Sequence, residues 1–279
     1  IILVDHSVGV LARAKALALG DVVTDDPARA VAQADCVILC VPVGAYEEIG
    51  HLIAPALKQG AIVSDVGSVK GAVVATLVPI LPEHAPLVPA HPVAGTEYSG
   101  PDAGFATLFM NRWCILTPQE GTDAKALRKV RAFWEALGAH VETMNSAHHD
   151  LVLAITSHVP HLIAYNLVGA AADLEEVTQS EVMKFSAGGF RDATRIAASD
   201  PTMWRDVFLN NRDAVLEMLG RFNEDLTALQ RMIRRGDGEG LHALFTRTRA
   251  IRMGIVALGQ DTAAPDFGRH SAETDEPAP

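Results

Sequence analysis

Two patterns of hydrophobic and polar positions divide the chain. Up to about residue 145, short aliphatic and β-branched runs alternate with stretches whose apolar positions have helical spacing. The runs typical of buried strands are IILVD (1–5), DCVILCVP (35–42), AIVSDVG (61–67), PLVPAHP (86–92), WCILTP (113–118) and AHVETM (139–144). Helical spacing falls on 8–19, 44–57, 69–80 and 122–137. This alternation predicts an α/β fold with a doubly wound parallel sheet over residues 1–145.

From about Ser146 the strand pattern stops and long helical patterns take over. They cover roughly 147–172, 176–198, 202–235 and 239–258. We therefore expect a second, all-helical domain over residues 146–259. The remaining residues, 260–279, are rich in Pro, Asp and Glu and lack periodicity, which predicts a disordered tail.

One apolar stripe in the helical half is long for a domain of this size. Its members are Val207, Phe208, Val215, Leu216, Met218, Leu219, Phe222 and Leu226. A stripe over so many turns needs more partner surface than one small bundle offers, which predicts dimerisation through the helical domain. The alternative is that the stripe packs within its own bundle.

Composition and charge exclude several classes of protein. Hydrophobic residues make up 49% of the 279 positions and the formal net charge is -11, so the chain can bury a core but repels nucleic acid and anionic membranes. No uninterrupted apolar stretch approaches the roughly 18 residues of a membrane span, and no basic leader is visible. The chain has three cysteines, Cys36, Cys40 and Cys114. Two of them lie inside apolar runs, where a small buried thiol is favoured over a disulfide or a metal ligand. We expect a soluble, cytoplasmic enzyme with a small-molecule substrate.

The beginning of the sequence carries its own prediction. In a dinucleotide-binding fold, an acidic residue at the end of the second strand binds the adenosine ribose, and Asp5 ends the first strand seen here. On this interpretation the true first strand and its glycine-rich phosphate loop precede Ile1, and indeed no G-x-G-x-x-G occurs in the sequence. Asp5 can also be an ordinary strand-end acid.

The next two strands end in segments suited to the nicotinamide end of a cofactor. Ligands of open parallel sheets collect at the carboxyl ends of strands, where Val41 and Pro42 follow one strand and Ser68 follows the next. Ser68 is also placed to cap a helix that begins near Val69, and the two roles are compatible.

The segment HPVAGTEYSGP (91–101) is the most informative in the chain. Its glycines and prolines predict an irregular loop after a strand, and it brings His91, Gly95, Thr96 and Glu97 together. A histidine at a strand end beside a dinucleotide site is suited to remove a hydroxyl proton while hydride leaves the same carbon.

Two later segments carry further polar groups. His158 and His161 lie three residues apart on a predicted helix that Pro160 loosens, so they share a face. A metal pair is disfavoured because no further ligand accompanies them, and a polar face of a substrate pocket is favoured. Arg191 and Arg195 follow Gly188 and Gly189; either can clamp a carboxylate bidentately, or pair at the surface with Asp192 and Asp200.

Taken together, DVGSVK, HPVAGTEYSG, TSHVPH and GGFRDATRIAASDPTMW, in this order, resemble the prephenate/arogenate (cyclohexadienyl) dehydrogenase family over nearly the whole chain. The resemblance implies a Rossmann-like domain, a helical dimerisation domain and an active site at the cleft between them. It implies NAD(P)-dependent oxidative decarboxylation of prephenate to 4-hydroxyphenylpyruvate, or of arogenate to tyrosine, in tyrosine biosynthesis.

The resemblance also implies roles for single residues. His91 matches the catalytic histidine, and Ser68 the serine that orients the substrate hydroxyl and the cofactor. His161, with His158 beside it, looks like the substrate-contacting histidine, and Arg195 like the arginine that binds a substrate carboxylate. Gly95, Thr96, Glu97 and Trp204 are assigned to the substrate pocket. Asp5 favours NAD over NADP because a carboxylate repels a 2′-phosphate, although NADP is also compatible.

Two other functions compete with this one. A 3-hydroxyacid dehydrogenase relies on a lysine in its helical domain, and the only lysine after Lys129 is Lys184, outside the motifs. A non-catalytic dinucleotide sensor would explain the missing phosphate loop. It has no need, however, of His91, His161 and Arg195 together.

Overall fold

The computed structural model describes residues 1–95, 98–178 and 184–257. By its internal contacts the chain forms two compact units, Ile1–Leu219 and Gly220–Pro279. Thr96, Glu97 and the predicted tail at 260–279 lie outside the described residues.

Eight strands lie in the described part of the first unit. They are β1 (Ile2–Val4), β2 (Val22–Thr24), β3 (Cys36–Leu39), β4 (Ile62–Asp65), β5 (Leu87–Val88), β6 (Ala90–Pro92), β7 (Trp113–Leu116) and β8 (His140–Thr143). Each of the six predicted runs contains a strand. The prediction missed β2, because three β-branched residues directly before Asp25, Asp26 and Pro27 are too few to show a period.

The predicted helices of the α/β part are shorter than their patterns: α1 (Val8–Ala16), α3 (Tyr46–Ile53), α4 (Lys70–Leu77) and α5 (Ala124–Ala136). A further helix, α2 (Pro27–Val31), lies outside the predicted patterns. Side chains cap three of them: Ser7, Asp26 and Asp123 each accept a hydrogen bond from a backbone N–H of the first turn.

The strands form three sheets, with orders β1-β2, β3-β4-β5 and β6-β7-β8. All neighbours run parallel except β6 and β7, which pair antiparallel with His91 opposite Ile115. Parallel neighbours need a crossover, usually a helix, whereas the described part of the β6–β7 connection holds only a 3-10 turn, Pro101–Ala103. This antiparallel pair departs from the purely parallel sheet that the sequence predicts.

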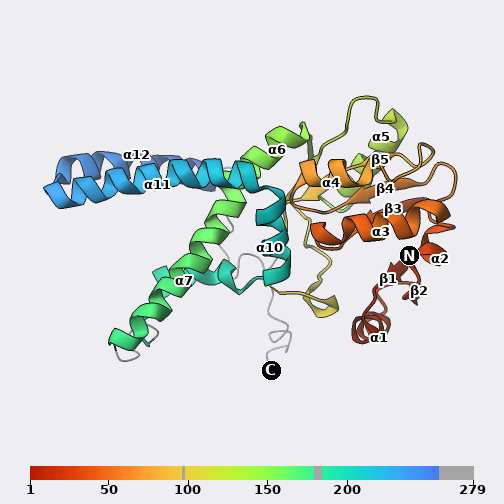
Figure 1. Ribbon diagram of the computed structural model, residues 1–279, viewed down its shortest axis with the longest axis horizontal. Coiled ribbons are helices and arrows are strands. Elements are labelled where there is room, and N and C mark those ends of the chain that lie inside the picture. The colour runs from red at the N-terminus through yellow and green to blue at the C-terminus, as the bar shows by residue number, and fades with distance from the viewer. Residues whose placement is uncertain (96–97, 179–183, 258–279) are drawn as a thin grey trace, which may run out of the picture. The chain divides into compact units, whose positions relative to one another are not determined.

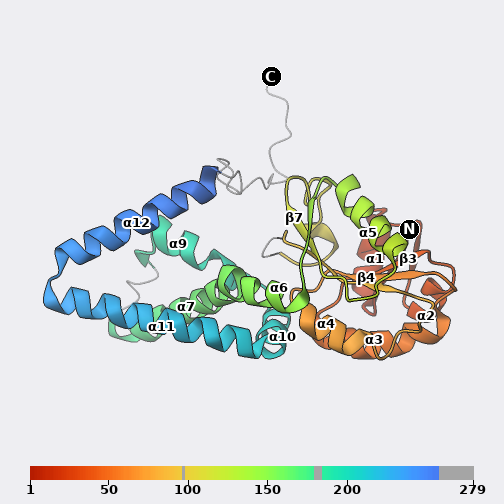
Figure 2. The same cartoon turned by 90° about the horizontal axis from the view of Figure 1, so that it is seen from above.

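Helices cover both faces of the β3-β4-β5 sheet (Figures 1 and 2). On one face, α2, α3 and α4 enclose a core that includes Val31, Ile53, Val63 and Leu77. On the other, α5 packs through Ala126, Val130 and Trp134 onto Ile62, Val88 and Leu116. Each face thus buries its own apolar layer, as in a doubly wound fold.

Two sheet edges in this unit have no second strand among the described residues. β1 pairs with β2 alone, and β3 with β4 alone. Ile2 and Val4 on β1 are exposed, as are Cys36 and Cys40 at β3, whereas Cys114 on β7 is buried. The prediction of buried thiols was therefore wrong for Cys36 and Cys40, because β3 is an edge strand here.

The helical part begins with α6 (Ser146–Leu153), a π-helical turn (Ala154–His158) and α7 (Val159–Thr178). It continues with α9 (Gly188–Thr194), a 3-10 turn (Arg195–Ala198), α10 (Pro201–Asn210), α11 (Arg212–Arg235) and α12 (Gly238–Ala257). The run predicted over 202–235 is broken at Asn211, which leaves helical geometry at φ -109° and ψ 32°. By length and composition Ser146–Asp173 could cross a membrane, which is weak evidence because core helices pass the same test.

The apolar stripe of the helical half serves two purposes. Val207, Val215 and Met218 are buried inside the first unit, where Val207 contacts Trp204 and Val69. Leu216 and Leu226 are exposed. Part of the stripe therefore packs within its own unit, and part of it is exposed to solvent.

Candidate active site

His91, on β6, lies buried at one end of a chain of hydrogen bonds. Its Nδ1 is 2.8 Å from Nε2 of His149, and Nδ1 of His149 is 2.8 Å from Oδ1 of Asp150. The two imidazoles meet edge to face with ring centroids 5.0 Å apart. All three side chains are buried, so a candidate base and a carboxylate are joined without intervening solvent.

The first turn of α6 determines where His149 and Asp150 lie. Asn145 caps the helix by accepting from the backbone N–H of His148, and His149 and Asp150 then fall on its buried face. Asp150 also accepts from the backbone N–H groups of Lys70 and Gly71, both at 2.8 Å, at the first turn of α4. A carboxylate is stabilised there by the free N–H groups and the helix dipole.

This arrangement corrects the prediction for Ser68 as a helix cap. α4 begins at Lys70, its N-cap is Val69, and neither side chain caps it. Asp150, from a distant helix, satisfies those N–H groups instead. Ser68 stays half-buried in the turn after β4.

A buried ion pair fixes the backbone beside His91. The Lys70 ammonium binds the Asp65 carboxylate and donates to the carbonyl of Ala90 at 2.6 Å. Asp65 also accepts from the N–H of Ala90 at 3.1 Å and from the hydroxyl of Tyr46 at 3.2 Å. Burial lowers the pKa of Lys70, and the neighbouring Asp65 opposes that shift.

The surroundings of His91 keep its imidazole neutral. Burial lowers the pKa of His91 well below 6.5, and the electrostatic effects of His149, Lys70 and His158 lower it further. A neutral imidazole retains a lone pair that can accept a proton at neutral pH.

A second group of aromatic and imidazole rings gathers around Trp204 on α10. His161 stacks on its indole with centroids 3.6 Å apart, and His158 meets it edge-on at 6.1 Å. Asn211 bonds through its amide nitrogen to the carbonyl of Asp150 at 2.8 Å and to Nδ1 of His158 at 3.1 Å. Asn211 thereby links this group to the His91 chain.

His158 presents an unused donor. Because the Asn211 amide donates to Nδ1, the other nitrogen, Nε2, carries the proton. That nitrogen is buried, and within the described part of the chain no hydrogen-bond partner faces it. Burial lowers the pKa of His158 to about 4, so this ring is also neutral at pH 7. A buried N–H without a partner is suited to an oxygen of a bound molecule.

The other predicted site residues are less closely joined. Burial lowers the pKa of His161; a backbone hydrogen bond to Ser157 opposes that shift, and the half-buried Arg195 adds to the lowering. Arg191 is exposed and pairs with Asp192 at 3.1 Å. Gly95 is exposed. Asp200 caps α10 by accepting from Met203 and so has a structural role.

The predicted cofactor residues lie at the carboxyl ends of two strands. Asp5 follows β1 and accepts from the N–H of Ser7 at 2.7 Å. Val41 and Pro42 follow β3, half-buried and exposed respectively. No contact of the described side chains joins Asp5 to the His91 group.

Sequence reasoning missed Lys70, His149, Asp150 and Asn211. The signal for two of them was present in Asn145 followed by SAHHD, a helix cap before consecutive titratable residues. Among the described residues, no group of three or more His, Cys, Asp or Glu side chains is placed to hold a metal.

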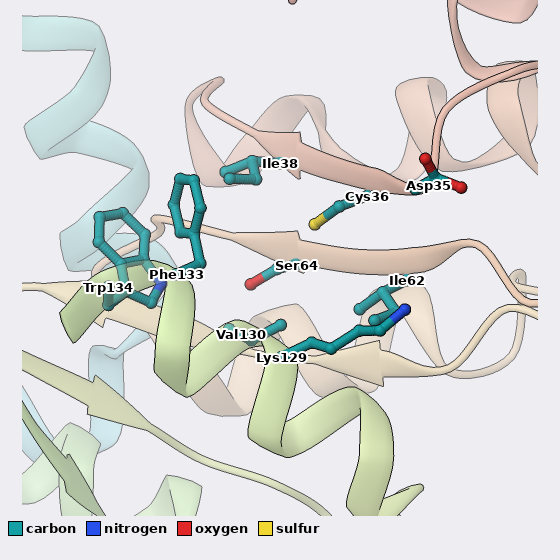
Figure 3. A pocket seen from close by; sticks show the side chains of 9 residues that line it. All are labelled: Asp35, Cys36, Ile38, Ile62, Ser64, Lys129, Val130, Phe133 and Trp134. Atoms are coloured by element: carbon teal, nitrogen blue, oxygen red, sulfur yellow. The ribbon is translucent and has the colours of Figure 1, made fainter. Parts of the chain in front are cut away.

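A separate hollow of about 210 Å³ lies between α5 and strands β3 and β4 (Figure 3). Cys36 and Ile38 line one side, and Phe133 and Trp134 the other. None of the predicted site residues lines this hollow.

Comparison with known proteins identifies the family. Residues 1–143 match the model of the prephenate dehydrogenase nucleotide-binding domain, and residues 145–247 that of the prephenate dehydrogenase dimerization domain. The chain belongs to the prephenate dehydrogenase family. A cyclohexadienyl dehydrogenase from Zymomonas mobilis is 47% identical over 253 residues, which cover 91% of this chain and 86% of that protein.

Two solved structures of family members share the fold. A prephenate dehydrogenase from Aquifex aeolicus, in complex with hydroxyphenyl propionate and NAD+, has a TM-score of 0.85 at 36% identity, covering 91% of this chain and 88% of that one. A Synechocystis arogenate dehydrogenase has a TM-score of 0.74 at 28% identity, covering 91% and 90%. The Rossmann-like nucleotide-binding domain and the helical domain expected from the sequence are both confirmed.

Proposed function

We propose that this chain is an NAD-dependent dehydrogenase that oxidatively decarboxylates prephenate, arogenate or both in tyrosine biosynthesis. The observation that carries the proposal is the buried, neutral His91 at the head of the His149–Asp150 chain, in a member of this family. The named relatives act on prephenate, arogenate or cyclohexadienyl substrates, and one is bound to NAD+.

The reaction needs one base and good orientation. His91 accepts the proton of the ring hydroxyl while the hydrogen on the same carbon leaves as hydride. NAD, when bound, accepts that hydride. The ring carboxylate then leaves as carbon dioxide, its bonding electrons make the ring aromatic, and the resulting phenolate takes a proton back from His91. The proton is thus returned within one turnover, and the base is regenerated.

Substrate groups are assigned to the neighbouring side chains. Arg195 binds a substrate carboxylate, while His161, supported by its stack on Trp204, holds the substrate beside His91. The buried N–H of His158 donates to an oxygen of the bound molecules. Ser68 orients the hydroxyl, and the family resemblance supports a substrate-binding role for Gly95, Thr96 and Glu97. Each of these residue roles is a proposal.

The residues present fit the two ends of a dinucleotide. Asp5 is suited to the adenosine ribose hydroxyls, which favours NAD over NADP, and Val41, Pro42 and Ser68 are suited to the nicotinamide end. We assign no residues to the pyrophosphate, because the glycine-rich loop G-x-G-x-x-G that would bind it does not occur in the sequence.

We assign cofactor binding to residues 1–145 and substrate binding with dimerisation to residues 146–259. Exposed apolar side chains on α11 and α12, including Ile233 and Phe245, support a homodimer formed through the helical domain. Three free thiols and a net charge of -11 support a cytoplasmic enzyme with no nucleic-acid or membrane partner.

The test is reduction of NAD and, separately, of NADP by the full-length gene product, supplied with prephenate or with arogenate. Turnover with either substrate, with the aromatic product identified by mass spectrometry, supports the proposal. Nucleotide binding by the folded protein with no turnover in all four combinations would contradict it and favour a dinucleotide sensor.

A further inference from the structure

We propose that His149 and Asp150 are positioning residues that fix the tautomer of His91 and hold its charge between proton removal and proton return. This inference rests on the proposed function of His91 as the base. It concerns two side chains that we argue act on the reaction through His91.

The hydrogen bonds assign the proton positions from Asp150 outward. An ionised carboxylate only accepts, and Asp150 accepts from two backbone N–H groups and from Nδ1 of His149. Nδ1 of His149 is therefore protonated. The proposal includes a neutral His149, whose Nε2 then carries the lone pair and accepts from His91, 2.8 Å away. His91 is then protonated on Nδ1, and its lone pair is on Nε2.

This tautomer is the one that a base requires. If Nδ1 of His91 had no acceptor, the neutral ring could place its proton on either nitrogen, and one of the two forms has no lone pair at Nε2. His149 removes that ambiguity, as the partner of a catalytic or metal-bound histidine does elsewhere.

The same chain answers an electrostatic difficulty. When His91 takes the substrate proton it becomes a cation in a buried site, and burial together with the neighbouring Lys70 ammonium disfavours that charge. The Asp150 carboxylate lies two hydrogen bonds away through His149. A proton shift from Nδ1 of His91 to Nε2 of His149 brings the cation into direct contact with Asp150 without breaking either hydrogen bond. Reversal of the shift restores the proton to His91.

The α4 helix sets the position of the whole chain. Asp150 is bound to the N–H groups of Lys70 and Gly71, and a Cβ on Gly71 would lie 2.8 Å from its Oδ2. The lack of a side chain at Gly71 thus lets the carboxylate approach the first turn of α4, where two N–H groups hold it beside His149. The Lys70 ammonium also binds the carbonyl of Ala90, next to His91. Lys70 therefore contacts both the Asp150 carboxylate, through its N–H, and the strand that carries the base.

The test compares His149→Phe, His149→Gln and His148→Gln, the last being an exposed neighbour that serves as control. Phe keeps the ring volume but accepts no hydrogen bond, whereas the Gln oxygen can still accept from His91. We expect kcat to fall about 10- to 100-fold in His149→Phe with KM within about threefold of native. His149→Gln should recover part of kcat, and His148→Gln should be native.

Nitrogen-15 NMR of the histidine rings supplies a readout that needs no substrate. Native protein and His149→Gln should show neutral His91 with Nε2 unprotonated, and His149→Phe a mixture of tautomers. A single native tautomer in His149→Phe, or native kcat in that variant, would overturn the inference. Because the spectrum is recorded without turnover, it decides the tautomer even if neither prephenate nor arogenate is a substrate.

Discussion

Asp206 on α10 accepts a hydrogen bond at 3.2 Å from the backbone N–H of Gly44, 162 positions earlier in the chain. Asp206 is buried and lies two residues from Trp204, while Gly44 lies two residues after Pro42. Asp150 makes the same kind of contact with α4. Two carboxylates from the dimerization-domain region therefore bind backbone N–H groups of the nucleotide-binding region.

Gly44→Ala tests this contact. The added Cβ would lie 2.5 Å from Oδ2 of Asp206, so the carboxylate must move and lose its partner. We expect a loss of about 1–3 kcal/mol in the free energy of unfolding, measured with urea. Gly169→Ala in α7 is the control, because its Cβ meets open space and should stabilise the helix by up to about 1 kcal/mol. Equal stability of both variants would contradict the contact.

The pH dependence of catalysis follows from the lowered pKa of His91. The base works in its deprotonated form, which persists as the pH falls until the folded-state pKa is reached. We expect kcat/KM to stay level from pH 8 down to about 6.5 and to fall only at more acid pH. An acid limb centred at 6.5 or above, in a kinetic profile with the substrate fully ionised, would show an exposed or charge-stabilised base instead.

His158 predicts a related change in stability. Its pKa is about 4 in the folded protein and 6.5 as the ordinary value, so the unfolded chain binds the proton first as the pH falls. The stabilisation is complete above 6.5 and is lost toward 4. Between pH 7 and pH 5 this histidine should cost about 2 kcal/mol of unfolding free energy. His158→Gln should lose correspondingly less over that interval, and an unchanged difference would rule out His158 as the cause.

The dimer prediction concerns the exposed apolar side chains of the second unit. Ile233 is 66% exposed and Phe245 is 56% exposed, fractions that a lone helical pair would not favour in water. We expect the double variant Ile233→Asp, Phe245→Asp to have the mass of one chain by light scattering, about 30 kDa. Gln230→Asp, which changes an exposed polar residue, should retain the native mass. A native protein that is already monomeric would refute the prediction.

Much of the fold follows from the sequence because strand runs and helix stripes repeat their period within a few residues. The six predicted runs contain seven of the eight described strands, and the pattern also separates the two halves of the chain. It cannot predict the break at Asn211, where the side chain is recruited by His158 and the carbonyl of Asp150. It also cannot predict that β6 pairs antiparallel with β7, since pairing depends on the path of the intervening loop.

Some residues of the candidate site can likewise be predicted from the sequence, and others cannot. His91, His158, His161 and Trp204 stand out in motifs, and the structure brings His158, His161 and Trp204 together and joins them to His91 through His149, Asp150 and Asn211. His149 and Asp150 are harder to find because their role depends on contact with β6 and α4, which lie 58 and 80 positions away. For Ser68 the local sequence was misleading: it predicts a helix cap, but the carboxylate of Asp150 binds the first N–H groups of α4 instead.

The most direct test of the account compares native full-length protein with His91→Asn in the formation of NADH from prephenate and from arogenate. Native protein should reduce NAD with at least one of them. His91→Asn should bind the same substrate with similar KM and lose about 10²-fold or more in kcat, the range expected for a general base. Near-native turnover by His91→Asn across the pH range would contradict the assignment of His91 and the mechanism built on it.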